Sequence, residues 1–146
     1  MKRYRSIVRI VFAVIFIGGG ISHFVLGRLY PNSYATFGRT ALIPGLRDLW
    51  SSWVMPNIGW LTILLGIYEV ACGVGILLRR TTRWATLGMI VFLVFITILG
   101  YGFPAASPGA DFLGNRLITI CMVLLLIPVL VAKPQPAGSR QQKPGE

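Results

Sequence analysis

The run Asn57–Leu78 constrains this chain more than any other stretch. Its sequence, NIGWLTILLGIYEVACGVGILL, is almost purely apolar and has the length of about 20 residues with which a helix crosses the hydrocarbon core of a bilayer. Glu69 lies near its middle, where an ionised side chain costs at least ~2.5 kcal/mol. An ionisable residue at that depth is by default a functional residue, so we expect Glu69 to meet a partner or a ligand there.

Small and polar residues share the helical face of Glu69. They follow one another at spacings of 3, 4, 3 and 4 residues, which places them on one side of a helix: Gly59, Thr62, Gly66, Glu69 and Gly73. A face of small residues lets a second helix approach closely. We therefore predict helix packing at Gly66 and Gly73, and at Gly20 of the first apolar run.

The composition is that of a membrane protein. Hydrophobic residues make up 55% of the chain and charged residues only 12%, and the mean hydropathy is +0.72, whereas soluble domains carry about 25% charged residues. The net charge of +10 does not indicate nucleic-acid binding, because the basic residues gather at the ends of apolar runs. One histidine and two cysteines without a CxxC pair predict no metal site, no bis-histidine haem and no CxxC-type redox centre.

The hydrophobic pattern predicts an all-α integral membrane four-helix bundle. The expected spans are residues 7–26, 58–78, 84–101 and 113–132, within one membrane domain over residues 1–132. A cleaved signal peptide is the alternative for the first run, but the run is long and no A-x-A-like cleavage site follows it. The polar, proline-rich residues 133–146 are expected to form a disordered cytoplasmic tail.

The long connection between the first two spans is rich in aromatic residues. After Pro44, Leu46, Leu49, Trp50 and Trp53 repeat at helical spacing, with polar residues on the other side. This pattern predicts a short amphipathic helix lying in the membrane interface. It would either seal the bundle at the level of the lipid headgroups or act as a lid over a site between the helices.

The basic residues are distributed unequally between the two ends of the predicted bundle. Ten lie on the side of the termini: Lys2, Arg3, Arg5, Arg9, Arg79, Arg80, Arg83, Lys133, Arg140 and Lys143. Four lie on the other side: Arg28, Arg39, Arg47 and Arg116. Because cytoplasmic loops carry the excess of Lys and Arg, we expect a multi-pass protein with both termini in the cytoplasm.

Glu69, His23 and Arg116 are the ionisable residues that can meet inside the bundle. Helical side chains lean toward the N-terminus of their own helix, and the first two spans run in opposite directions, so His23 and Glu69 reach toward each other. Arg116, with Asn115 beside it, is expected to meet Glu69 only through water or a shared ligand. Three structural roles remain open: a neutral Glu69 hydrogen-bonded to a neighbour, an interfacial His23, and an Arg116 that anchors to headgroups.

Over residues 7–132 the chain resembles the DoxX-like family of small four-helix bacterial membrane proteins. The resemblance is carried by GGGISHF late in the first span, by YEVACGVGILLRRTTRWAT, and by Asn115-Arg116 at the start of the last span. The family is named after a subunit of a terminal quinol oxidase or thiosulfate:quinone oxidoreductase. The resemblance therefore implies a protein of the bacterial plasma membrane with redox partner proteins, possible access to quinone, and no established catalysis of its own.

Three functions are compatible with the sequence. In the first, the chain is an accessory membrane subunit of a redox or quinone-linked system, in which Glu69 and His23 relay a proton or bind a headgroup. In the second, it is a non-catalytic scaffold or assembly factor. In the third, it is a small proton-coupled transporter of a cationic or amphipathic solute, a class whose known four-span members act as homodimers.

Overall fold

The computed structural model describes residues 2–131, and these residues are helical with no strand among them. Three helical segments are long and apolar enough to cross a membrane: α1 (Lys2–Leu29), the segment Leu46–Leu77 that includes α3 (Ile58–Leu77), and α4 (Thr82–Leu99). A bent pair, α5 (Pro108–Asn115) and α6 (Leu117–Leu130), also passes this test when the two helices are taken together. The chain is thus an all-α membrane protein, and its predicted tail at 133–146 lies outside the described residues.

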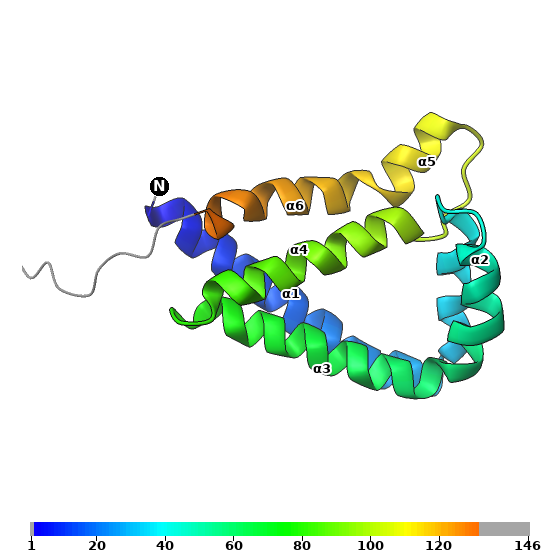
Figure 1. The fold of residues 1–146 in the computed structure, drawn as a ribbon, viewed down its shortest axis with the longest axis horizontal. Coiled ribbons are helices and arrows are strands. Elements are labelled where there is room, and N and C mark those ends of the chain that lie inside the picture. The colour runs from blue at the N-terminus through cyan, green and yellow to red at the C-terminus, as the bar shows by residue number, and fades with distance from the viewer. Residues whose placement is uncertain (1, 132–146) are drawn as a thin grey trace, which may run out of the picture.

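The long helices converge at one end and separate at the other (Figure 1). The N-terminal part of α1, the turn between α3 and α4, and the C-terminal end of α6 lie together at the converging end. The apolar core lies at this end. It is formed by residues of α1, α3, α4 and α6: Val8, Phe12, Ala13, Phe16, Cys72, Ile76, Ala85, Met89, Leu93, Leu126 and Val129. The connection between α1 and α3 and the loop between α4 and α5 lie at the other end.

Glycines bring α1 and α3 into direct backbone contact. A Cβ atom added at Gly20 would lie 2.6 Å from the carbonyl oxygen of Gly66, and one added at Gly66 would lie 2.7 Å from the carbonyl oxygen of Gly20. At Gly73 an added Cβ would lie 2.7 Å from Cγ1 of Ile17. No larger side chain fits at these positions without a shift, and the close approach holds the face of Glu69 against α1.

The connection from α1 to α3 is helical over most of its length. A 3-10 helix, η1 (Pro31–Thr40), is followed by α2 (Leu46–Leu49), a π-helical turn η2 (Trp50–Val54) and a 3-10 turn η3 (Met55–Asn57). The stretch after Pro44 is therefore helical, but it continues into α3 instead of forming a separate short helix, and its place in the membrane interface stays a prediction. Proline lacks a backbone N–H, and Pro56 lies in the stretch where the hydrogen-bonding pattern changes.

The fourth apolar run differs from the single helix expected at residues 113–132. Helix α5 begins earlier, at Pro108, where the Ser107 hydroxyl accepts a hydrogen bond from the Ala110 N–H at 3.2 Å. The chain then leaves helical geometry at Arg116 (φ −134°, ψ −35°), and α6 starts at Leu117, bent by 51° from α5. The bend places Arg116 between two helices and not within one.

Candidate functional site

The carboxyl group of Glu69 is buried between α3 and α1. Glu69 is 5% exposed, and it faces Gly19, where an added Cβ atom would lie only 2.7 Å from Oε2 of the glutamate. The missing side chain of Gly19 therefore makes the space that the carboxyl group occupies. The glycine run of α1 signals close packing in the sequence, but it does not show that one glycine faces the acid.

His23 lies one turn beyond Gly19 on α1 and contacts the same carboxyl group. Its Nε2 is 3.5 Å from Oε1 of Glu69, and the two side chains are 19% and 6% exposed. This separation is longer than the 2.7–3.2 Å of a usual N–H···O hydrogen bond. The structure thus brings the two predicted residues together in close contact, without a direct hydrogen bond between them.

Tyr34 of η1 extends this pair on the other side of the imidazole. Its hydroxyl is 2.6 Å from Nδ1 of His23, and its own backbone carbonyl accepts a hydrogen bond from Nε1 of Trp50 at 2.9 Å. The ring stacks on Phe37, with centroids 6.1 Å apart. Burial, and to a lesser degree the charge of Glu69, raises the pKa of Tyr34, so its hydroxyl stays protonated near neutral pH. No sequence pattern distinguishes Tyr34 from the other aromatic residues of this loop.

A cavity of about 290 Å³ opens beside the Glu69–His23 pair. Its walls come from α1, η1, η2, α3 and α4, with Tyr101 and Met122 completing them. Seven of the lining residues are aromatic: Phe16, Tyr34, Phe37, Trp50, Phe92, Phe95 and Tyr101. Ile15 and Phe95, which also line it, are 45% and 42% exposed. The cavity therefore reaches the apolar outer surface of the helices.

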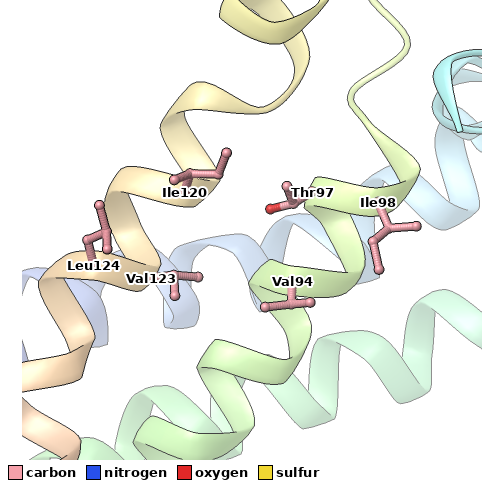
Figure 2. A pocket seen from close by; sticks show the side chains of 6 residues that line it. All are labelled: Val94, Thr97, Ile98, Ile120, Val123 and Leu124. Atoms are coloured by element: carbon pink, nitrogen blue, oxygen red, sulfur yellow. The ribbon is translucent and has the colours of Figure 1, made fainter. Parts of the chain in front are cut away.

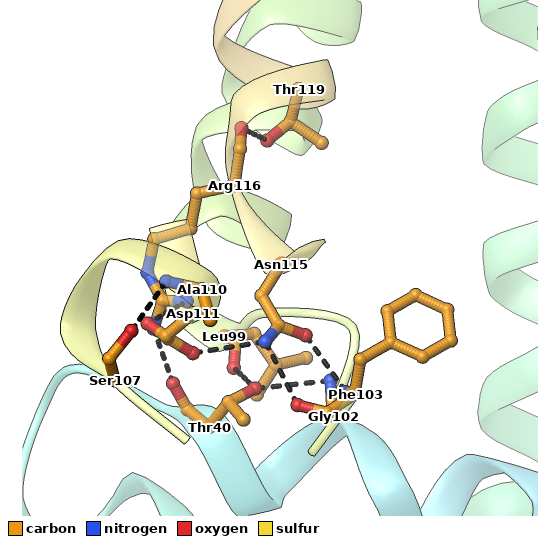
Figure 3. Close-up of polar contacts among 10 residues, drawn as sticks. All are labelled: Thr40, Leu99, Gly102, Phe103, Ser107, Ala110, Asp111, Asn115, Arg116 and Thr119. Carbon is orange, nitrogen blue, oxygen red and sulfur yellow. Dashed lines mark hydrogen bonds and ion pairs between the residues drawn. The ribbon is translucent and has the colours of Figure 1, made fainter. Parts of the chain in front are cut away.

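Arg116 and Asn115 do not line this cavity and belong to a separate polar cluster (Figure 3). Nη1 of Arg116 is 2.8 Å from Oδ2 of Asp111, and Nη2 donates to the carbonyl oxygen of Thr40 at 2.5 Å. Asn115 accepts from the N–H of Phe103 at 2.9 Å and donates to the carbonyl of the same residue at 3.1 Å. Both residues are buried. They fasten η1, the loop after α4 and the bend between α5 and α6 to one another, which is a structural role.

A second, smaller hollow of about 160 Å³ lies between α4 and α6 (Figure 2). Five of its six lining side chains are aliphatic: Val94, Ile98, Ile120, Val123 and Leu124. The sixth, Thr97, is hydrogen-bonded to the Leu93 carbonyl and to the Thr119 hydroxyl, each at 2.7 Å. No polar group of the lining is left for a ligand, so this hollow offers packing only.

The described residues hold no group of three or more His, Cys, Asp or Glu side chains placed as metal ligands. The two cysteine thiols are free, with Cys72 buried and Cys121 exposed. The polar groups of the cavity lining are the Glu69 carboxyl, the His23 imidazole, two phenols and the indole of Trp50.

A family model described as DoxX matches residues 5–102. No curated protein and no solved structure matches the chain significantly. The matched range is more than half of the 146 residues. It contains every residue that lines the large cavity except Met122, and it ends before Asn115 and Arg116. The chain belongs to the DoxX family.

Proposed function

We propose that this protein is an integral membrane subunit of a quinone-linked redox system, and that the cavity beside Glu69 binds the headgroup of a quinone-like lipid. One observation carries the proposal: an acid and an imidazole 3.5 Å apart line a cavity of about 290 Å³ whose other walls are largely apolar and aromatic. That volume is near the lower end of small-molecule sites, about 300 to 1,000 Å³, and suits a single-ring headgroup.

The cavity walls suit this class of ligand. Aromatic side chains stack on a planar ring, while Glu69 and His23 supply the hydrogen-bonding groups that orient it. The exposed rim at Ile15 and Phe95 leaves a path by which an isoprenoid tail extends into lipid. A bound quinone supplies two ring oxygens that take up protons when a partner protein delivers electrons. The chain's own part is to hold the ring, exclude water, and keep a proton available on Glu69 or His23.

The proposal includes a membrane topology. The three apolar helical segments and the bent pair α5–α6 would make four spans of a bacterial plasma membrane protein, with α2 and η2 at the interface opposite the termini. Both termini would then face the cytoplasm, because ten of the fourteen basic residues lie on their side.

Ligand binding by the protein in lipid nanodiscs tests the proposal. Calorimetric titration with a short-tailed ubiquinol under anaerobic conditions is expected to show saturable binding. We expect it to be weakened about tenfold in Glu69→Gln, because a carboxylate accepts the hydrogen bond of a quinol hydroxyl more strongly than an amide does. Asp48→Asn, a matched change at an exposed acid on α2, is expected to bind like the wild type. Absence of saturable binding, or equal affinity of Glu69→Gln, would overturn the proposal.

A second candidate, a proton-coupled transporter of a lipophilic cation, is favoured by the charge of the cavity. Among its described lining residues there is one acid and neither Lys nor Arg, and aromatic faces attract quaternary ammonium groups. Addition of tetraphenylphosphonium to the purified protein would then release protons, and Glu69→Gln would abolish the release. The scaffold alternative predicts that Glu69→Gln changes thermal stability alone.

A further inference from the structure

Tyr34 and Glu69 contact opposite nitrogens of one imidazole. Nδ1 of His23 lies 2.6 Å from the Tyr34 hydroxyl, and Nε2 lies 3.5 Å from Oε1 of Glu69. A neutral imidazole carries its proton on one nitrogen, and the hydrogen bond made by the other nitrogen decides which one. The Tyr34 hydroxyl can therefore determine whether Nε2 of His23 carries a proton toward Glu69 and the cavity.

We propose that Tyr34 is a positioning residue that donates its hydroxyl hydrogen to Nδ1 and so fixes His23 in the tautomer with the proton on Nε2, directed at Glu69. This inference deepens the proposed function and rests on it for its biological meaning. With Nε2 as a donor, the site offers an N–H to an oxygen atom that lies in the cavity beside His23 and Glu69. The ligand class that fits is therefore one with an acceptor oxygen, such as a ring carbonyl.

The surroundings of Tyr34 hold its hydroxyl in place. The Trp50 N–H donates to the Tyr34 carbonyl at 2.9 Å, the Phe37 ring stacks on the Tyr34 ring, and the Gly38 backbone lies against the Trp50 ring. Tyr34 itself is 6% exposed, so water competes little for its hydroxyl. None of these contacts uses the phenol oxygen, and Tyr34→Phe therefore removes the bond to His23 and keeps the rest.

The chain contains a single histidine, so ¹⁵N-histidine labelling reports His23 without an assignment step. We would record the two ring-nitrogen shifts of the protein in lipid at alkaline pH, with no ligand added. In the wild type we expect a protonated Nε2 and a hydrogen-bonded, unprotonated Nδ1. In Tyr34→Phe we expect the Nδ1 signal to move toward that of a free imine nitrogen or to become a mixture of tautomers.

Two further variants keep the test decisive. Tyr101→Phe makes the same chemical change in the same cavity, and it is expected to leave both shifts as in the wild type. Trp50→Phe removes the bond to the Tyr34 carbonyl, and it is expected to move the Nδ1 signal in the direction of Tyr34→Phe if that variant does not fold. The inference would be overturned by a proton on Nδ1 in the wild type, by a doubly protonated ring, or by shifts that are the same in Tyr34→Phe as in the wild type. Because no ligand is present, this result is independent of whether quinone binds.

Discussion

At the scale of single residues, the Glu69 carboxyl has its space because Gly19 carries no side chain. Gly19→Ala would place a methyl group 2.7 Å from Oε2, closer than real Cβ contacts, and the carboxyl group would have to turn away. We expect the contact with His23 to be lost and ubiquinol to bind about tenfold more weakly, the equivalent of ~1.4 kcal/mol. Calorimetric titration in nanodiscs measures this change.

Gly18 is the matched control for this substitution. It is the preceding residue on the same helix, and an added Cβ atom meets nothing within 4 Å. Gly18→Ala is expected to keep the wild-type affinity and to stabilise α1 slightly, since alanine favours helix over glycine by up to ~1 kcal/mol. Equal affinities of the two alanine variants would show that the carboxyl group does not depend on Gly19.

The sequence predicts part of this site for a clear physical reason. The meeting of His23 and Glu69 follows from the direction in which helical side chains lean in two antiparallel spans. Tyr34 and Gly19 were not predicted. Tyr34 reaches His23 through the path of a 3-10 loop that no periodicity specifies, and the role of Gly19 depends on the rotation of α1 about its own axis. The role of Glu69 itself stays a prediction.

At the scale of helices, the contact between α1 and α3 depends on glycines that leave no room for a side chain. Gly66→Ala would put a methyl group 2.7 Å from the Gly20 carbonyl oxygen, which is backbone and cannot rotate away. Overpacking of this kind costs about 1 to 3 kcal/mol, so we expect a lower midpoint of thermal unfolding in detergent. Gly59→Ala, on the same helix with nothing within 4 Å, is the control and is expected to unfold at or above the wild-type temperature.

The bend between α5 and α6 is held by the ion pair of Asp111 and Arg116. Asp111→Asn removes the charge 2.8 Å from Nη1 and leaves a buried guanidinium without its counter-charge. Asp111 is partly exposed, so we expect a loss of about 1 to 3 kcal/mol, below that of a fully buried pair. Thermal unfolding measures the loss, with the exposed Asp48→Asn as the control. A variant as stable as this control would show that the Thr40 and Asn115 contacts suffice.

The helices themselves were largely predictable and their irregularities were not. Long apolar runs become helices because lipid leaves no other partner for the backbone, and the apolar run expected at 58–78 forms α3 at Ile58–Leu77. The start of α5 at Ser107-Pro108 carries an N-cap serine and a first-turn proline, a local signal that the span predicted at 113–132 does not include. The non-helical backbone of Arg116 depends on partners in η1 and after α4, and such distant contacts are not visible in local sequence.

At the scale of the whole molecule, the two ends of the helical structure differ in how they are packed. The converging end holds the apolar core contributed by all four helices. The other end holds the cavity between α1, α3 and α4, and η1 and η2 cover it. The core at the converging end fixes the helices relative to one another. The fold is therefore kept although the other end contains a cavity.

The proposed orientation of the helices in the membrane rests on the distribution of basic residues, and it decides which side of the membrane the site faces. If ten basic residues face the cytoplasm, η1 faces the periplasm. In a Cys72→Ala, Cys121→Ala background, Ser33→Cys on η1 is expected to react with an impermeant maleimide in intact spheroplasts. Arg80→Cys, in the turn between α3 and α4, is expected to react only after lysis. The reverse pattern would place η1 in the cytoplasm, and the cavity would then be covered from that side.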